Sequence, residues 1–325
     1  MINSKSIDLL LRGVRAEFAN VVDQADKQLA AYAANIYLDA GNQTGALFEE
    51  INAQGQQRVE SIAIAGVSEL QPTGEAQEFP ATDYVPSYVT SVEPYKFSRR
   101  IKVTRESAER RDSKYQKALN EASKLQVAAE NTKARHRFDR FNNAFSVVTD
   151  KHLFDYGDGV ALCSASHPRK VGAVQSNVVT ASDISPTSIE SMVLVLQNQM
   201  DDIGEPMPMG GGHNYIVVPP AKVRRAKEVI ESDWVVDNAN NNINVWKGQG
   251  WSIVTSPFLS ATHGGSNTAW FIVDANFSPL KDVMFRPVTN ETWFDENTKV
   301  FVHDISMEHK VGAYDWRGIV GNEGA

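Results

Sequence analysis

Apolar residues recur every three or four positions along two long stretches of the chain, which is the period of an α-helix. The first stretch, 5–40, is rich in alanine and ends at the sequence GNQTG. The second, 105–148, contains no proline or glycine. We therefore predict two amphipathic helices, of which the second is the longest in the chain.

Between these helices the pattern changes to alternation of apolar and polar residues, which is typical of half-buried strands. RVESIAIAGVSEL and SYVTSVEPYKFSRRIKVT alternate, and QPTGEAQEFPATDYVP lies between them with three prolines and no periodicity. The simplest interpretation is a long two-stranded arm with an irregular tip. The alternative is two ordinary sheet strands joined by a long loop. Because an isolated hairpin is marginally stable in water, we expect the arm to lie against a partner surface.

The C-terminal half mixes short apolar runs with helical segments. Residues 150–184 are rich in loop-forming residues, and SPTSIESMVLVLQNQMDD predicts a helix with capping-box spacing at Thr187 and Glu190. Further strands and a helix follow up to residue 290, which indicates a compact α/β core. Alternation resumes in KVFVHDISMEHKVGAYDW. It predicts an antiparallel hairpin with its turn near Met307–His309.

Composition narrows the class of protein. The chain has 325 residues, 42% hydrophobic and 22% charged, which is ordinary for a globular protein. The formal net charge of −8 argues against adhesion to nucleic acid through a broadly basic surface. The single cysteine permits no intrachain disulfide, which fits a reducing cytosol. No segment has the length and apolar character of a signal peptide or a membrane span.

The strongest candidate for catalysis is Cys163, which precedes His167 by four residues. A catalytic thiolate needs a base within hydrogen-bond reach, and sequence neighbours rarely meet this geometry. We therefore favour a packed or turn-forming role for both residues. The glycines at 210–212 lack the pattern of a phosphate-binding loop, and the seven histidines lack zinc-site spacing. We expect no catalytic site, no cofactor and no metal.

The order of elements resembles the major capsid proteins of tailed phages with the Hong Kong 97 fold, and most closely the Mu-like major head subunits. The residues that carry the resemblance are VEPYKFSRRIKVTRESAERRD, FDRFNNAF, ALCSASHP, QSN, YIVVPPAKVRRAKEVIESD, NVWKGQGWSIVTSPFLS and NTAWFIVDANFSPLKDVMFRP. They occur in order over nearly the whole chain.

The resemblance implies an α+β, Hong Kong 97-type capsid fold. Its expected parts are an N-terminal arm and helix (1–54), an extended β-hairpin loop (55–104), a peripheral domain with the long spine helix (105–184), an α/β axial domain (185–298) and C-terminal strands that return to the peripheral domain (299–325). Some relatives form covalent cross-links through a lysine of the extended loop. Here no lysine lies between Arg58 and Lys96, so we predict no such cross-link.

The function that the resemblance implies is a major capsid protein that self-assembles into hexamers and pentamers of an icosahedral shell around phage DNA. Its partners would be copies of itself, a portal, scaffold or decoration proteins, and packaged double-stranded DNA bound without sequence preference on the inner face. Assembly would take place in the host cytoplasm, and the product would be the virion capsid. The alternatives are an encapsulin-like compartment shell and a Cys/His hydrolase.

Two regions supply the candidate inter-subunit contacts. Axial-domain loops are expected to meet at the capsomer centre, and the extended loop is expected to lie over a neighbouring subunit. The candidates are Glu75, Phe79, Tyr84 and Tyr88 in the extended loop, Arg99 and Arg100 at its base, and Asn240 and Asn241 in the axial loop.

Overall fold

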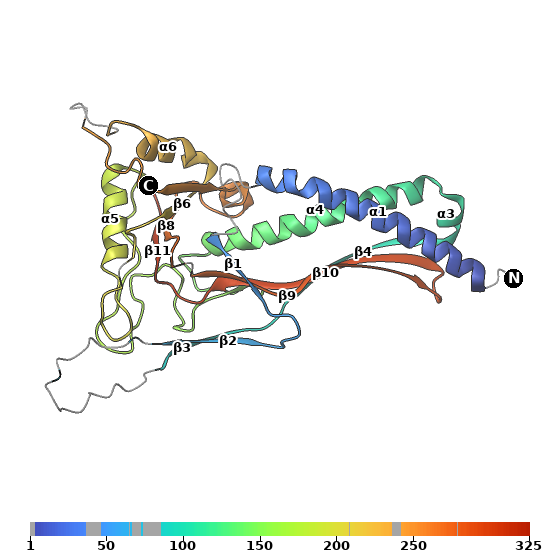
Figure 1. The fold of residues 1–325 in the computed structure, drawn as a ribbon, viewed down its shortest axis with the longest axis horizontal. Coiled ribbons are helices and arrows are strands. Elements are labelled where there is room, and N and C mark those ends of the chain that lie inside the picture. The colour runs from blue at the N-terminus through green and yellow to red at the C-terminus, as the bar shows by residue number, and fades with distance from the viewer. Residues whose placement is uncertain are drawn as a thin grey trace.

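The protein is elongated, with a compact end and a long, narrow extension (Figure 1). The compact end carries α5 and α6, and the extension runs from it towards the N-terminus. This computed structural model describes residues 4–36, 47–64, 66, 73, 86–207, 209–235, 242–277 and 279–325.

A five-stranded sheet, the long sheet, runs along the extension. Its strands lie in the order β1-β9-β10-β4, and β5 also pairs with β10. Buried and half-buried residues alternate along much of β10, because helices cover one face of the sheet and leave the other face more open. The strands are β1 (Glu49–Asn52), β4 (Lys96–Thr104), β5 (Leu153–Phe154), β9 (Leu280–Asp295) and β10 (Val300–Ala313).

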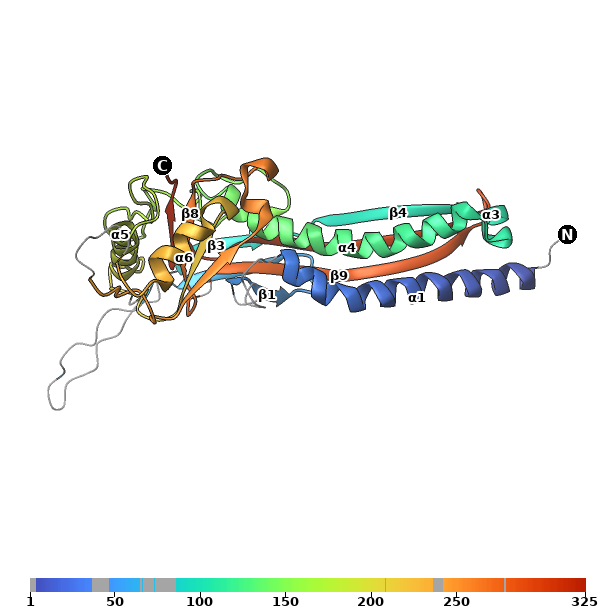
Figure 2. The ribbon, with the colours of Figure 1, turned by 90° about the horizontal axis from the view of Figure 1, so that it is seen from above.

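Two long helices, α1 (Ser4–Ile36) and α4 (Ser113–Asn142), lie along the long sheet. Figure 2 shows both helices running beside β9 and β4. Phe18 of α1, Tyr115 of α4 and Phe301 of β10 meet in one buried cluster. The helix predicted over 5–40 is thus confirmed as far as Ile36. Its amphipathic face packs on α4 and on the long sheet.

The second predicted helix, over 105–148, is broken near its start. A short helix, α3 (Arg105–Arg110), ends at Arg111, whose backbone is left-handed with φ of 47°. Asp112 then caps α4 by accepting hydrogen bonds from the backbone N–H groups of Lys114 and Tyr115. No proline or glycine marks this break, because an arginine supplies the left-handed residue and an aspartate supplies the cap.

The compact end is built around a four-stranded sheet, the axial sheet, with the order β11-β8-β6-β7. β6 and β7 are parallel, and α6 lies in the connection between them. Every residue of β6 is buried, as expected for a strand covered on both faces. The elements are α5 (Pro186–Gln197), β6 (Asn214–Val218), α6 (Val223–Glu231), β7 (Trp251–Thr255), β8 (Trp270–Asp274) and β11 (Ile319–Asn322), with single turns of 3-10 helix at Pro220–Lys222, Pro257–Leu259 and Ala261–His263.

The capping box of α5 lies two residues before the predicted one. Ser185 accepts a hydrogen bond from the backbone N–H of Ser188 at 3.1 Å, and the Ser188 hydroxyl accepts one from the backbone N–H of Ser185 at 2.8 Å. Thr187 and Glu190 share the sequence spacing but lie inside the helix. Pro186 decides the difference, because it occupies the first helical position and makes Ser185 the cap.

The arm is shorter than the sequence predicted. Its two strands, β2 (Val59–Ile64) and β3 (Pro86–Val92), pair antiparallel. The residues after them, Lys96–Thr104, were expected to extend the arm over the whole of 55–104, but they form β4 and pair with β10. The alternating pattern correctly predicted strands at β3 and β4. It could not show that β3 pairs with β2 whereas β4 pairs with β10.

Two strands pair outside the domain ranges that the resemblance implies, and the domain ranges themselves stay predictions. β9 lies within the range assigned to the axial domain (185–298), yet it pairs with β10 and β1 in the long sheet. β11 lies within the range assigned to the peripheral domain (299–325), yet it pairs with β8 in the axial sheet. The chain therefore crosses between the two sheets near residues 275–280 and again near 314–318.

The hairpin turn predicted near Met307–His309 is wrong. β10 continues through these residues, and its register with β9 shifts between Ser306 and His309. The turn lies instead between Asp295 and Val300, where Lys299 has φ of 56°. Buried and half-buried residues keep alternating along β10 from Asp304 to Val311, and the extra residues at the register shift lie on β9.

Candidate inter-subunit surfaces

The arm is fixed to the body of the molecule along β3. Ser87 and Thr90 are buried, and the Thr90 hydroxyl accepts a hydrogen bond from the backbone N–H of Gly157 at 3.1 Å. Tyr88, one of the predicted contacts, lies between Tyr156, at 5.7 Å between ring centroids, and the Lys170 ammonium, at 3.7 Å from its ring centroid. Tyr88 therefore anchors the arm within its own chain.

The other face of the arm carries exposed apolar side chains. Ile62 and Val89 are opposite each other in the β2–β3 pairing, and 56% and 49% of their surfaces are exposed. A cross-strand apolar pair that faces water lacks the burial that normally stabilises a two-stranded ribbon. This pair could have been found in the sequence as the apolar positions of the alternating segments, but its exposure required the structure.

Five of the predicted contacts cannot be placed. Glu75, Phe79 and Tyr84 of the extended loop, and Asn240 and Asn241 of the axial loop, lie outside the described residues. They stay predictions.

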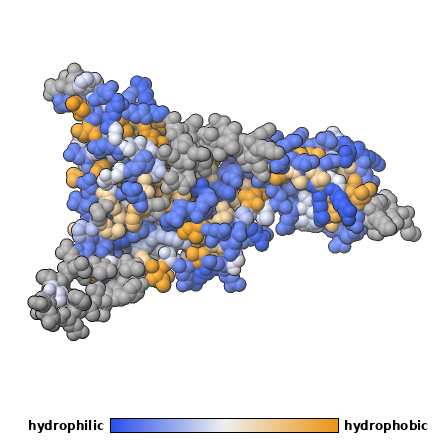
Figure 3. Space-filling model, in the orientation of Figure 1, coloured by the Kyte–Doolittle hydropathy of each residue, from blue (hydrophilic) through white to orange (hydrophobic). Residues whose placement is uncertain are grey.

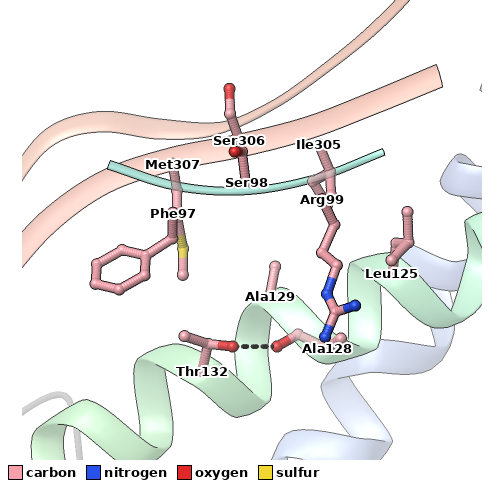
Figure 4. A pocket seen from close by; sticks show the side chains of 10 residues that line it. All are labelled: Phe97, Ser98, Arg99, Leu125, Ala128, Ala129, Thr132, Ile305, Ser306 and Met307. Atoms are coloured by element: carbon pink, nitrogen blue, oxygen red, sulfur yellow. Dashed lines mark hydrogen bonds between the residues drawn. The ribbon is translucent and has the colours of Figure 1, made fainter. Parts of the chain in front are cut away.

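The two arginines predicted at the base of the arm lie on opposite faces of β4. Arg100 binds Asp304 with two hydrogen bonds of 2.7 and 2.6 Å, and its guanidinium lies 5.0 Å from the ring centre of Trp293. Arg100 is thus engaged within the chain. Arg99 is exposed and points from β4 towards α4 (Figure 4).

Arg99 borders a groove of about 240 Å³ between α4 and the edge of the long sheet. In Figure 4 the side chains of Phe97, Met307 and Ile305 point into this space from the strands. Leu125 and three smaller residues of α4 line the opposite side. The groove is mainly apolar, with one cation at its rim.

The stem of the axial loop carries an apolar surface that the sequence analysis missed. Trp234 and Ile243 form a bridge between the two sides of the stem, and Trp234, Ile243 and Val245 are 55%, 76% and 65% exposed. Figure 3 shows hydrophobic side chains at this corner of the molecule, at the upper left. The sequence signal is the WVV and INVW runs on either side of the asparagines.

Cys163 and His167 do not form a thiolate site. Cys163 is buried, and burial raises the pKa of its thiol to about 12, so the thiol stays protonated at neutral pH. The ring nitrogens of His167 lie 2.8 Å from a carboxylate oxygen of Asp158 and 3.2 Å from the amide oxygen of Asn177. Both residues are thus buried and packed, which confirms the predicted packing role.

A buried histidine cluster joins α4 to the long sheet. His136 Nδ1 lies 2.9 Å from His309 Nε2, and His309 Nδ1 lies 3.1 Å from a carboxylate oxygen of Asp282. Arg137 donates to the other carboxylate oxygen of Asp282 at 2.9 Å. His152 stacks on His136 with 4.2 Å between ring centroids. Burial, together with His309 and His152, lowers the pKa of His136 to about 2.

The described residues contain no cluster of metal-ligating side chains and no helix suited to a membrane span. Among them, no three or more His, Cys, Asp or Glu side chains are grouped so that they could hold a metal ion. None of the helices in the described segments has both the length and the apolar character to cross a membrane. Hydrogen bonds and ring stacking account for the contacts of the histidine cluster.

An extended arm, a long helix on a long sheet and a separate axial sheet are the parts expected of a capsid subunit. A family model described as phage capsid protein matches residues 87–322, which is more than half of the chain. The chain belongs to the phage capsid protein family. Members of this family are capsid subunits, and the protein is accordingly a major capsid protein that forms a shell.

Solved capsid structures share this fold at low sequence identity. The capsid of an empty GTA particle is 9% identical, with a TM-score of 0.54, over 86% of this chain and 88% of that chain. A structure of Mycobacterium phage Patience is 10% identical, with a TM-score of 0.52, over 94% and 88%. They support the α+β, Hong Kong 97-type capsid fold.

A third structure, a virus-like particle from Pyrococcus furiosus, is 10% identical over 96% of this chain and 98% of that chain. Its TM-score is 0.45. No curated protein matches the sequence. The resemblance to Mu-like head subunits in particular stays a prediction.

Proposed function

We propose that this capsid protein assembles into hexamers and pentamers of an icosahedral shell that encloses double-stranded DNA. The observation that carries the proposal is the arm, which is anchored on one side and exposes the pair Ile62–Val89 on the other. A neighbouring copy is the partner that would cover this pair in a shell built from one kind of subunit.

The axial loop provides a second surface for the same assembly. Trp234, Ile243 and Val245 project from the compact end, and a large exposed aromatic side chain is typical of the core of an interface. Subunits arranged in a ring around their axial loops would bury these three residues at the capsomer centre.

The protein acts, in this proposal, by binding copies of itself and not by catalysis. The support is the burial of Cys163 and the engagement of His167 by Asp158 and Asn177. A net charge of −8 also suits a shell that must release its DNA, since a strongly basic wall would hold many phosphates. A portal and scaffold or decoration proteins complete the proposed partners, and assembly takes place in the host cytoplasm.

Electron microscopy of the full-length protein after expression tests the proposal. We expect closed shells or capsomer rings. The double variant Ile62→Thr/Val89→Thr keeps β-branched side chains on the arm but reduces its apolar surface, so it should yield mostly unassembled subunits. Val147→Thr, at a valine that is also 56% exposed, serves as the matched control and should assemble normally.

The contents of the particles separate the alternatives. Shells that hold nucleic acid when the phage packaging machinery is present support a capsid. Shells that selectively hold a folded protein, and no DNA under those conditions, would instead support an encapsulin-like compartment. A stable monomer at all concentrations contradicts both, and a hydrolytic activity that Cys163→Ala abolishes would restore the enzyme hypothesis.

A further inference from the structure

A buried ion cluster lies where the arm meets the body of the molecule. Arg317 Nη2 donates to a carboxylate oxygen of Asp202 at 2.5 Å, and Arg317 Nη1 lies 3.1 and 3.2 Å from the two carboxylate oxygens of Asp315. Arg317 Nε donates to the backbone carbonyl of Met200 at 2.8 Å. Only 3% of Arg317 and 2% of Asp202 are exposed. All three guanidinium nitrogens are therefore held in a fixed geometry.

The arm takes part in this cluster through one side chain. The Ser87 hydroxyl donates to the second carboxylate oxygen of Asp202 and lies 3.2 Å from the Tyr156 hydroxyl. Asp202 thus binds Arg317 with one oxygen and the arm with the other. A hydrogen bond to a buried carboxylate is stronger than one between neutral groups, because the interior screens charge weakly.

The backbone of β3 is shaped to place Ser87 there. Ile62 pairs with Val89 and Ile64 pairs with Pro86, so three steps along β3 are opposite two steps along β2. This extra residue is a β-bulge, which bends a strand and redirects a side chain. As a result both Ser87 and Thr90, three residues apart on one strand, are buried against the body.

Arg317 and Asp315 lie in the segment that joins the two sheets. β10 of the long sheet ends at Ala313, and β11 of the axial sheet begins at Ile319. Asp202 lies in the turn that follows α5, where its backbone carbonyl accepts a hydrogen bond from the backbone N–H of Val171. The cluster therefore contacts the arm, the end of the long sheet and the start of the axial sheet at a single point.

We propose that Ser87, Asp202 and Arg317 form a clamp that fixes the direction of the arm relative to both sheets, and thereby the curvature that one subunit imposes on the next. Three sequence-distant segments are joined by charged hydrogen bonds in a buried site. Removing one of these side chains leaves the buried charges of the others incompletely compensated. The statement about curvature rests on the proposed shell function, and the statement about the arm direction does not.

Hydrogen exchange of the purified full-length protein tests the clamp itself. In Ser87→Ala the amides of 59–64 and 86–92 should exchange about tenfold faster or more, because the arm loses a hydrogen bond to a buried charge. Ser91→Ala, at an exposed serine on the same strand, is the matched control and should exchange like the wild type. Equal exchange in the two variants would overturn the proposal.

A double-variant cycle tests whether the charge and the serine act together. Asp202→Asn should also speed exchange of the arm, and the effects of Ser87→Ala and Asp202→Asn together should be less than additive in free energy, since both remove the same hydrogen bond. Glu190→Gln, at an exposed acid on α5, controls for the loss of a charge. Fully additive effects would contradict a shared clamp.

Particle diameters measured by electron microscopy test the consequence for assembly. Ser87→Ala should give a broader distribution of diameters than the wild type and Ser91→Ala. An unchanged distribution, with faster exchange of the arm, would overturn the link to curvature. If the wild type forms no shells at all, the proposed function fails, whereas the exchange experiments still decide whether the clamp holds the arm.

Discussion

At the scale of single residues, His136 shows how burial of a polar group sets its chemistry. His136 is surrounded by two other imidazoles and by the ring of Phe97, 4.7 Å away between ring centroids. Asp282 and Arg135 are the charged groups that act on it from β9 and α4. Burial replaces water by aromatic rings, and Coulomb interactions with His309 and His152 add to this effect, so a proton on His136 is strongly disfavoured.

The lowered pKa of His136 predicts acid sensitivity. An unfolded histidine titrates near 6.5, and this one titrates near 2, so the unfolded state binds more protons as the pH falls below about 6.5. The free energy of unfolding should therefore be unaffected by His136 above that pH and decrease below it. The expected loss is about 2 kcal/mol at pH 5.

Urea unfolding at several pH values between 8 and 5 measures this effect. His136→Phe should flatten the dependence on pH, even if it changes the stability itself. His303, whose pKa burial also lowers, remains in the variant and leaves a residual slope of the same sign. The same slope in both proteins would mean that His136 does not contribute.

At the scale of elements, hydrophobic periodicity showed where helices and strands are, and local capping chemistry decided where they begin and end. The helix α5 (Pro186–Gln197) is an example, because the sequence showed its apolar stripe but placed its cap two residues too late. The break between α3 and α4 is another, because a left-handed arginine has no distinctive sequence pattern.

The cap of α5 gives a prediction with an internal control. Ser185→Ala should reduce the free energy of unfolding by about 1 kcal/mol, because the backbone N–H of Ser188 loses its acceptor. Thr187→Ala removes the hydroxyl that the sequence predicted as the cap. It should change the free energy of unfolding by only a few tenths of the change in Ser185→Ala. Equal losses in urea unfolding would show that the serine cap contributes nothing special.

Strand partners were the part of the fold that the sequence could not supply. β4 alternates just as β2 and β3 do, and β9 directly follows the axial strand β8 in the chain, so neither the pattern nor the position reveals which sheet each strand joins. Pairing is decided by contacts between residues far apart in the chain, such as Arg100 with Asp304. The same holds for the candidate contacts. The sequence indicated that Tyr88 and Arg100 are side chains that make contacts, but it could not identify their partners within the chain.

At the scale of the whole molecule, the subunit has separate cores for its two ends. One cluster, with Phe18 and Phe301, lies under α1 and α4 in the extension. Two others, around Phe141 and Ile216, lie at the compact end. Exposed apolar residues remain on the arm and on the axial loop, the two surfaces that we expect neighbouring copies to cover.

A substitution in the axial loop should weaken assembly of the subunits without changing how each subunit folds. Trp234→Ser should raise the protein concentration needed for assembly about tenfold or more, because each contact loses the burial of a large aromatic side chain. Its unfolding temperature as a subunit should hardly change, since Trp234 is 55% exposed. Light scattering across a concentration series checks this. Normal assembly of Trp234→Ser, or poor assembly of a Val147→Ser control, would contradict it.

The position of β10 between β9 and β4 has a consequence for biosynthesis. β4, near residue 100, has β10 as its partner in the long sheet, and β10 is not made until residues 300–313 are synthesised. Arg317 of the clamp and β11 of the axial sheet come later still. The two sheets can therefore close only after β10 and β11 have been synthesised. A nascent chain that still lacks these strands cannot fold into a subunit competent for assembly.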